Sequence, residues 1–373
     1  MKFSHNQHFE YRIFDSLIDK NVSFALYRLP GDYTVNFIIQ NSPRRHLLRR
    51  LSDLNTKKGF VIAPFHISEQ SPIILIEPDI TLKGEEIIFQ FLDTNNIEGS
   101  LHNESNDYSP VNSFDTYKDI YTKFHSAVNS NSFEKLVLSR TCDHENDESF
   151  SAGVSFDRAC DKYPESFVYL CHTPETGTWL GSSPELLISG QGDNWKTVAL
   201  AGTKNVSSTT SEWDEKNRME QEIVVNYMQL QLQKAELPFI QSEPTNLQAG
   251  NIIHLKTEFS FKMPDLMKIG NLLELLHPSP AVCGFPKEEA FRFILENEGY
   301  DRQYYSGFLG CLDVDNKTDM YVNLRCTKVN KKSSLLFAGG GILPSSDLES
   351  EWEETENKMQ TILSIIEETP LDL

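Results

Sequence analysis

Short apolar runs separated by polar residues dominate the first hundred residues of the chain. Alternation and β-branched content predict strands at residues 33–39, 59–63, 73–76 and 87–91. Polar residues prevail from 93 to 113, which indicates an exposed connection and the one candidate boundary. We expect residues 1–105 to form an N-terminal β-rich segment of the same fold as residues 106–373, so that the whole chain is one structural domain.

Longer elements of two kinds follow from residue 114. A helical period predicts helices over residues 114–129, 212–234 and 348–367. Apolar runs predict strands near residues 136–140, 167–171, 178–181, 251–261, 307–313, 319–328 and 334–338. The strands and helices do not alternate as regular βαβ units, so the predicted class is α+β with antiparallel strands.

Composition narrows the class of protein. The 373 residues carry a net charge of −20. Aromatic side chains make up 11% of the chain, and this aromatic content excludes a disordered chain. The acidic balance argues against a protein that binds nucleic acid or anionic membranes. The sequence contains no run of about 18 apolar residues, so no membrane span is predicted. The N-terminus is polar, so no signal peptide is predicted. Six scattered cysteines without a CxxC pair fit reduced thiols, so we expect a cytoplasmic protein.

The helix predicted over 212–234 carries a carboxylate beside its apolar stripe. The stripe consists of Met219, Ile223, Tyr227 and Leu230. Glu220 lies three positions before Ile223 and therefore on the same face. A carboxylate there either reaches water at the edge of the stripe or binds a hard cation, which prefers oxygen ligands.

The last helix carries three charged residues on one flank. Glu351, Glu354 and Lys358 stand at positions i, i+3 and i+7. One interpretation is a solvated ion pair between Glu354 and Lys358, worth about 0.3–0.5 kcal/mol. The other is that these groups belong to a binding site, because the segment before the helix is unusual.

That segment is Gly339-Gly340-Gly341, which ends an apolar run. Three glycines permit a close backbone approach and leave N–H groups for an anion. They form neither a GxGxxG motif before a helix nor a phosphate-binding Walker loop, so a nucleotide site is not predicted. A β-bulge or a tight turn is the structural alternative.

Three further side chains combine charge with apolar neighbours. Glu185 precedes two leucines, so burial would raise its pKa and suit it to general-acid catalysis. Lys135 begins a buried strand and could act as a base, although most lysines at such positions are solvated. Arg325 ends an apolar run and could bind a carboxylate with its bidentate fork or pair with an acid at the core edge.

Taken in order, these segments and several others resemble the chorismate-utilising enzymes, the anthranilate synthase component I-like family, and within it the isochorismate synthases. The resemblance runs from about residue 114 to 366. It rests on the motifs at residues 135–140, 181–187, 200–203, 215–220, 254–255, 277–284, 305–307, 323–325, 338–341 and 351–358. It implies a large α/β sandwich of antiparallel sheets flanked by helices.

The resemblance also implies a Mg²⁺ cofactor and a set of site residues. Glu220 and Glu354 look like metal ligands, with Glu351 close by through water. Lys135 looks like the base that activates water for attack at C2 of chorismate, and Glu185 like the acid that protonates the departing C4 hydroxyl. The residues that would bind the substrate are Gly202, Thr203, His254, Ala281, Val282, Tyr305, Arg325, Gly339, Gly341 and Lys358.

Within the family, Lys135 and the Ala281-Val282 pair favour an isochorismate synthase. The resemblance by itself also implies a monomer and, by preference, menaquinone biosynthesis. Siderophore biosynthesis is the alternative pathway, a salicylate synthase is the nearest competing activity, and a non-catalytic anion-binding paralogue is a competitor of another class. Three positions depart from the pattern: Gln221 replaces a usual His, Asn323 a small apolar residue, and Cys283 a small Ser or Gly.

Overall fold

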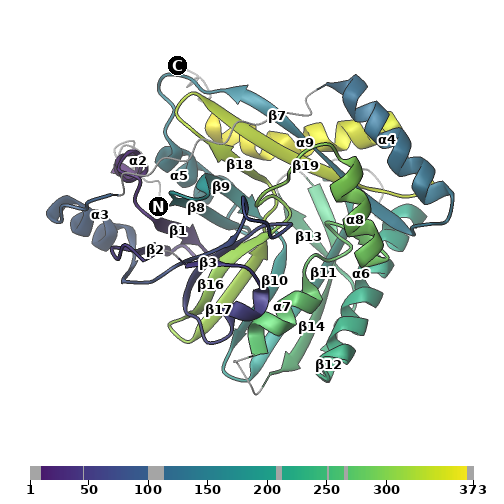
Figure 1. Cartoon of the computed structure of the whole chain (residues 1–373), viewed down its shortest axis with the longest axis horizontal. Coiled ribbons are helices and arrows are strands. Elements are labelled where there is room, and N and C mark those ends of the chain that lie inside the picture. The colour runs from purple at the N-terminus through teal and green to yellow at the C-terminus, as the bar shows by residue number, and fades with distance from the viewer. Residues whose placement is uncertain are drawn as a thin grey trace.

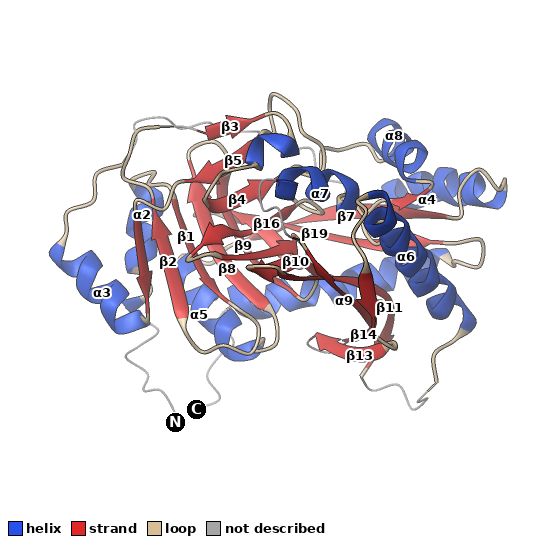
Figure 2. Cartoon of the chain, turned by 90° about the horizontal axis from the view of Figure 1, so that it is seen from below, coloured by secondary structure: helices blue, strands red, loops and turns tan. Residues whose placement is uncertain are grey.

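The computed structural model describes residues 10–44, 46–99, 113–206, 212–249, 252–263 and 268–367. Within these ranges the chain forms two large sheets at the centre, with helices around them (Figure 1). All strand pairs that the two sheets contain are antiparallel, so the predicted α+β class with antiparallel sheets is confirmed. In Figure 2 the strands occupy the middle of the molecule and the helices lie around them.

The first sheet has nine strands in the order β15-β7-β19-β18-β9-β8-β1-β2-β6. In chain order these are β1 (Phe24–Arg28), β2 (Val35–Ile39), β6 (Ile80–Lys83), β7 (Lys135–Glu145), β8 (Phe167–Thr173), β9 (Gly177–Ser183), β15 (Gly284–Phe285), β18 (Cys326–Val329) and β19 (Ser333–Ile342). The long pair of β7 and β19 runs from Glu145 opposite Ser333 to Leu136 opposite Ile342. The three glycines of β19 lie inside this continuous register, so neither the predicted bulge nor the turn occurs there.

The second sheet has the order β12-β14-β11-β10-β17-β16-β4-β5-β3, and β13 also pairs with β14. Its strands are β3 (His46–Leu48), β4 (Gly59–Ala63), β5 (Ile73–Ile76), β10 (Leu186–Gln191), β11 (Asn194–Asn205), β12 (Phe239–Gln241), β13 (Thr245–Ala249), β14 (Ile252–Lys262), β16 (Phe308–Val314) and β17 (Lys317–Val322). Strands before and after residue 105 thus belong to both sheets. The predicted boundary at 105/106 itself lies outside the described residues.

Helices cover the outer faces of the two sheets. They are α2 (Ile13–Asp19), α3 (Glu85–Thr94), α4 (Phe114–Asn129), α5 (Ala152–Lys162), α6 (Glu215–Lys234), α7 (Ile269–Leu276), α8 (Lys287–Asn297) and α9 (Leu348–Ile366), with a short 3-10 turn η1 (Leu51–Leu54). Helices α2, α5 and α9 pack on the nine-stranded sheet, and α6 packs on β11 and β14 of the other sheet. No helix in the described ranges is both long and apolar enough to cross a membrane.

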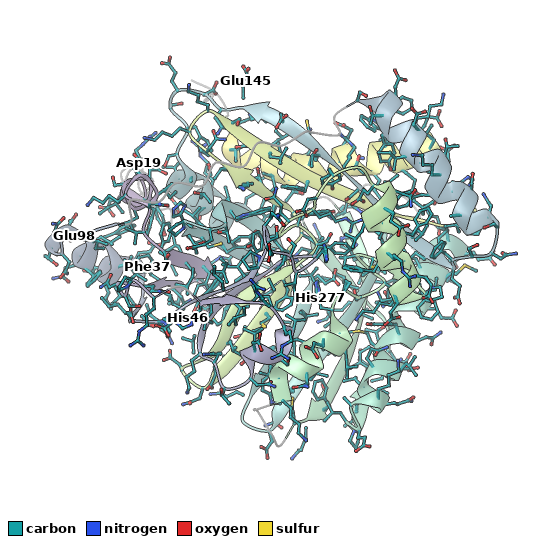
Figure 3. All side chains as sticks on the ribbon, in the orientation of Figure 1. Asp19, Phe37, His46, Glu98, Glu145 and His277 are labelled. Atoms are coloured by element: carbon teal, nitrogen blue, oxygen red, sulfur yellow. The ribbon has the colours of Figure 1, made fainter. Side chains whose placement is uncertain are left out.

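Three apolar layers form most of the core, and a fourth cluster packs α4 and α8 against β7. Aromatic residues of both sheets, including Tyr27, Phe60, Tyr169 and Trp179, form the layer between the sheets. A second layer joins the nine-stranded sheet to α2, α5 and α9, and a third joins the ten-stranded sheet to α6 and α7. Side chains fill the interior from end to end, and His277 lies buried there after α7 (Figure 3). This core gives the groups on the central strands rigid positions.

Two predicted elements are wrong. Residues 87–91 form part of helix α3, because Ile88 and Leu92 are buried at a spacing of four after the helix start at Gly84. The predicted strand 319–328 is two strands in different sheets, since residues 323–325 interrupt it. The chain thus passes from the ten-stranded to the nine-stranded sheet at this interruption. The six cysteines all lie in described ranges and none of them forms a disulfide.

Candidate active site

A cavity lies where β7 and β19 of one sheet face β11 and β14 of the other. Every site residue named from the sequence lines it except Lys135 and Glu351. The lining residues among them are Glu185, Gly202, Thr203, Glu220, His254, Ala281, Val282, Tyr305, Arg325, Gly339, Gly341, Glu354 and Lys358. A cavity with so many polar and charged lining residues suits a small polar ligand.

Lys135 lies directly behind the cavity wall. It is the first residue of β7 and has no exposed surface, and its Nζ lies 2.6 Å from Oε1 of Glu220. A Cβ on Gly341 would lie 2.7 Å from Cε of Lys135 and 2.5 Å from Oε1 of Glu220. A side chain at this position of β19 would therefore displace the ends of Lys135 and Glu220 from the space in which they meet.

Glu220 comes from α6, whose buried face differs from the predicted stripe. Met219 and Leu230 are 51% and 43% exposed, whereas Gln221, Val224 and Met228 are buried. The predicted stripe is confirmed at Ile223 and Tyr227 and wrong at Met219 and Leu230, because it counted apolar residues only, while the helix buries Gln221 and Gln231 as well. Glu220 lies at the edge of the true buried face and reaches the cavity.

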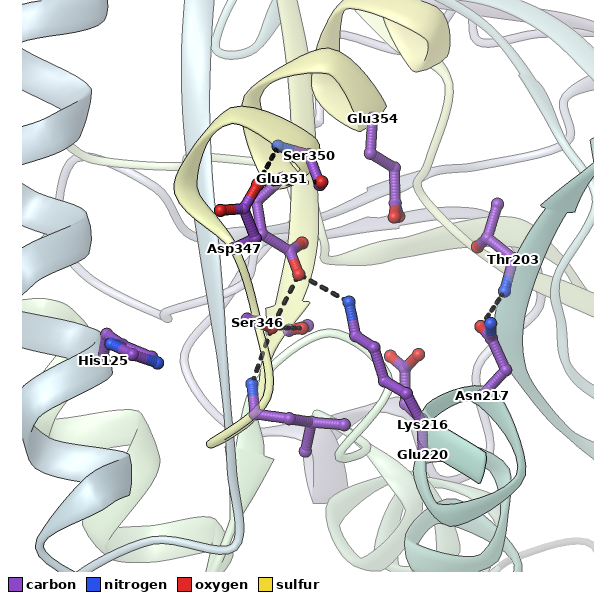
Figure 4. A network of polar contacts seen from close by, with 12 residues as sticks. His125, Thr203, Lys216, Asn217, Glu220, Ser346, Asp347, Ser350, Glu351 and Glu354 are labelled. Atoms are coloured by element: carbon purple, nitrogen blue, oxygen red, sulfur yellow. Dashed lines mark hydrogen bonds and ion pairs between the residues drawn. The ribbon is translucent and has the colours of Figure 1, made fainter. Parts of the chain in front are cut away.

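Helix α9 supplies two further carboxylates, Glu351 and Glu354. Glu351 is 1% exposed, and its Oε1 accepts hydrogen bonds of 2.6 Å from Lys216 and from Ser346, whereas its Oε2 has no partner (Figure 4). A Cβ on Gly340 would lie 2.8 Å from that Oε2 and 3.8 Å from Oε1 of Glu354. The two carboxylates therefore converge on the same glycine of β19.

The pKa values of Glu351 and Glu354 are shifted in opposite directions. Burial and the charge of Glu354 raise the pKa of Glu351. Burial acts to raise the pKa of Glu354 as well, but the charge of Lys358, whose Nζ lies 2.5 Å from Oε1, holds it below its ordinary value. The i,i+4 ion pair predicted from the sequence is thus present, and it lines the cavity instead of a solvated face.

The donor set fits a hard divalent cation. Three carboxylates from α6 and α9 surround the glycines of β19, and the buried Oε2 of Glu351 has an unused lone pair. In the described part of the chain, no three acidic, histidine or cysteine side chains are already arranged as a metal-binding group. Each of the three carboxylates is instead paired with a lysine: Lys135, Lys216 or Lys358.

The opposite wall is shaped by an irregularity in β11. The register with β14 shifts between Ala201 and Lys204, and Gly202 adopts a φ of +71°. The Oδ1 of Asn217, in the first turn of α6, accepts a 2.7 Å hydrogen bond from the backbone N–H of Thr203. Gly202 and Thr203 are therefore turned toward the cavity and fixed to the helix that carries Glu220.

His254 on β14 is held as a neutral ring. Its Nδ1 lies 2.9 Å from the carbonyl oxygen of Gly202, so this nitrogen carries the proton and donates. Its Nε2 lies 3.4 Å from NH2 of Arg325 and can only accept. Burial, and then the charge of Arg325, lower the pKa of His254 to about 3. The ring therefore acts as a hydrogen-bonding and shaping group and carries no charge at neutral pH.

Arg325 is a buried cation without a carboxylate partner. Its φ is +47°, an uncommon conformation for a side-chain-bearing residue, and its carbonyl accepts a hydrogen bond from the N–H of Ser182. Among the described residues no carboxylate lies within ion-pair distance of its guanidinium. A buried unpaired guanidinium is costly unless an anion compensates it, so the cavity favours an anionic ligand.

Glu185 faces this positive wall from the turn between β9 and β10. Its carbonyl accepts a 2.9 Å hydrogen bond from the N–H of Val322, which fixes the backbone. Burial raises the pKa of Glu185 to about 8, although the charges of Lys135, Arg325 and Lys358 act to lower it. The carboxyl is therefore protonated at neutral pH and can donate a proton.

The remaining cavity residues place donors and apolar surface. Lys358 donates a 2.7 Å hydrogen bond to the carbonyl of Gly339, and Tyr305 stacks on Phe337 with ring centroids 5.3 Å apart. Ala281 and Val282 line the wall after α7. These groups give the cavity one flat apolar side beside its charged sides.

The three departures from the family pattern lie behind the cavity. Gln221 donates to the carbonyl of Ala199 and lies 3.2 Å from the hydroxyl of Thr257. Asn323 accepts a hydrogen bond from Tyr169 and donates to the carbonyl of Tyr304. Cys283 packs in the apolar cluster with Phe124 and Leu136. None of the three lines the cavity, so each affects its shape only through neighbours.

Sequence reasoning missed three polar residues. Lys216 and Ser346 hold Glu351, and Ser306 lines the cavity with a buried hydroxyl that has no partner. Lys216 stands four residues before Glu220, a spacing that places both on one side of a helix and could have identified it. Ser346 gave no such signal, because its contact depends on the loop before α9.

Comparisons with known proteins agree with this architecture. A family model described as chorismate binding enzyme matches residues 54–367. The isochorismate synthase EntC of Escherichia coli (strain K12) is 31% identical over 261 residues, which cover 67% of this chain and 66% of that protein. The isochorismate synthase MenF of Bacillus subtilis (strain 168) is 28% identical over 254 residues, with 65% and 53% covered. The match thus spans 66% of the length of the first relative.

Solved structures share the fold over nearly the whole chain. The menaquinone-specific isochorismate synthase MenF from Escherichia coli aligns with a TM-score of 0.76 at 19% identity and covers 98% of this chain and 92% of its own. The putative 2,3-dihydroxybenzoate-specific isochorismate synthase DhbC from Bacillus anthracis gives 0.74 at 21% identity, with 94% and 98% covered. At these identities the likeness concerns the fold, including its N-terminal strands.

Proposed function

We propose that this chain, which belongs to the chorismate-binding enzyme family, is an isochorismate synthase. The reaction adds water at C2 of chorismate and expels the C4 hydroxyl as water, so that the net change is an isomerisation. The similarity to the isochorismate synthases EntC and MenF supports the proposal. The pathway that uses the product stays a prediction, with menaquinone biosynthesis preferred.

Substrate binding relies on concentrated positive charge in an acidic protein. A net charge of −20 repels a dianion at long range, so the site needs local cations. Arg325, which has no carboxylate partner among the described residues, and Lys358 would bind one carboxylate of the substrate beside Gly339, Gly341 and the Tyr305 hydroxyl. Gly202, Thr203 and His254 would contact the ring from the other side.

A divalent cation would complete the site. Glu220, Glu351 and Glu354 have the oxygen donors that Mg²⁺ prefers, and we propose that they hold it in the substrate complex. A bound Mg²⁺ would supply positive charge for the second substrate carboxylate. Without such a charge three carboxylates would face an anionic substrate, which is electrostatically unfavourable.

Two residues would move the protons. Lys135 is paired with Glu220 as an ammonium. Once this ion pair is lost and the ammonium has released a proton to solvent, the neutral amine would accept a proton from the water that attacks C2. Glu185 would donate its proton to the C4 oxygen, because a hydroxyl leaves readily only when it is protonated. The single observation that carries the proposal is this pair: a buried carboxyl that stays protonated and a buried lysine close enough to influence its pKa.

The deciding experiment is to incubate the purified full chain with chorismate, with and without Mg²⁺, and to identify the product by chromatography. We expect isochorismate, formed only with the metal. Salicylate with pyruvate would indicate a salicylate synthase instead, and binding of chorismate without turnover would indicate a non-catalytic paralogue. A Lys135→Ala variant should lose about 10²–10⁴-fold in turnover. Lys234→Ala, an exposed lysine of α6, is the matched control that should keep the wild-type rate.

A further inference from the structure

Lys216 is the most exposed of the three lysines that neutralise the carboxylates. It lies in the first turn of α6, and its Nζ is 2.6 Å from Oε1 of Glu351 (Figure 4). Its side chain is 30% exposed, whereas Glu351 is 1% exposed. Lys216 therefore enters a buried acidic cluster from the solvent side.

Lys216 interacts electrostatically with more than one carboxylate. It stands one helical turn before Glu220, and the charges of Glu351, Glu354 and Glu220 all act to raise its pKa against the effect of burial. The Oε2 of Glu351 lies buried without a partner next to Gly340. Lys216 is therefore attracted by all three acids, yet it contacts only Oε1 of Glu351 and leaves the Oε2 of that residue free.

We propose that Lys216 is a built-in counter-ion of these acids, which a divalent cation must displace from Glu351 in order to bind. The proposal rests on the proposed function, because it assumes that Glu220, Glu351 and Glu354 hold the metal. Lys216 would then hold the acids together when the metal is absent and set the metal concentration at which they exchange partners.

The geometry explains why Lys216 is the residue that leaves. An ammonium that is 2.6 Å from a carboxylate oxygen would repel a dication bound to the same oxygen. Lys216 can move toward solvent because part of its side chain is already exposed. Lys135 is completely enclosed at the start of β7 and has no such route. The exchange at Glu351 therefore needs no opening of the core.

The test measures Mg²⁺ binding to the metal-free full chain by isothermal titration calorimetry without substrate. Lys216→Met removes the competing charge, so we expect the Kd for Mg²⁺ to fall about fivefold or more relative to the wild type. Lys216→Gln, which keeps a donor for Glu351 and so favours correct folding, should shift the Kd in the same direction. Lys234→Met removes the same charge from the far end of α6 and should leave the Kd unchanged.

A second test measures thermal stability with and without Mg²⁺. The metal-free Lys216→Met protein should melt below the wild type, because Glu351 loses its partner, and saturating Mg²⁺ should raise its Tm by more than that of the wild type. Unchanged or weaker Mg²⁺ binding in both Lys216 variants would overturn the role of Lys216 alone. A wild type that binds no Mg²⁺ would overturn both this inference and the metal part of the proposed function.

Discussion

Two buried clusters of acids and bases adjoin the same strand, β7, and they are built in different ways. The first is the pair Arg302 and Glu298, and the second is the carboxylate cluster of Glu220, Glu351 and Glu354 with its lysines. Both lie in the described core next to Val137, which lines the cavity. Only the second contains a buried oxygen that lacks a partner, Oε2 of Glu351.

The first cluster is closed. Glu298 accepts hydrogen bonds of 2.6 Å from Nε and NH2 of Arg302, and two more from the N–H and hydroxyl of Ser139. The guanidinium also donates to the carbonyls of Val282 and Val137. Both side chains of the pair are 1% exposed. Such a network has no capacity left for a ligand.

The second cluster is open. Oε2 of Glu351 is buried without a hydrogen-bond partner, and the group adjoins the cavity. The difference teaches that burial of charge does not by itself mark a site. A satisfied network fixes the structure, whereas an incompletely satisfied one next to a cavity is where a ligand can add favourable interactions.

The largest expected effect comes from opening the closed cluster. Arg302→Met leaves the carboxylate of Glu298 buried without its partner, which should lower the free energy of unfolding by about 3–5 kcal/mol. Urea denaturation followed by circular dichroism measures the loss. The double variant Arg302→Met/Glu298→Gln removes the orphaned charge and should recover part of it. A loss no greater than that of an exposed arginine would remove the distinction between the two clusters.

The next effect concerns the acid that faces the open cluster. Glu185→Gln keeps the shape but cannot donate a proton, so turnover of chorismate should fall about 10²–10³-fold. The KM should change little, because the amide still fills the same space. Steady-state kinetics gives both values. If kcat survived and only KM rose, Glu185 would be a binding residue and another group would be the acid.

The pH dependence of Glu185 sharpens the same point. Burial raises its pKa from 4.5 to about 8, so the folded state binds the proton more tightly than the unfolded state does. The resulting stability is fully present below pH 4.5, and it is lost as the pH rises through about 8. Turnover should fall over the same upper range. Relative to Glu185→Gln, which cannot titrate here, the wild type should therefore lose stability between these values, as chemical denaturation at several pH values will measure.

The smallest effect is expected from Gln221, the neighbour of Glu220 that faces the sheet. Gln221→Leu removes its hydrogen bonds to the carbonyl of Ala199 and to Thr257, at a cost of about 1 kcal/mol in stability. Turnover should remain within about twofold of the wild type, because the side chain does not line the cavity. A large loss of activity with little loss of stability would instead assign Gln221 to the site.

The sequence alone determined the class of fold and most long elements. The helix over 114–129 and the strands at 167–171 and 307–313 follow from local periodicity, which depends only on neighbouring residues. Ordered motifs also identified the residues that line the cavity. Local patterns failed where tertiary contacts outweigh them: at 87–91, a short apolar run that becomes helical, and at Met219, an apolar residue left in solvent.

Only the tertiary structure decided how the charged residues are paired. Lys135 and Glu220 are far apart in sequence, and so are Lys216 and Glu351, and they meet because β7, β19, α6 and α9 pack together. Glu185 owes its raised pKa to the same packing, which removes it from water. Periodicity records which side of an element is buried, but the partner of a buried charge is set by segments that the chain brings together from a distance.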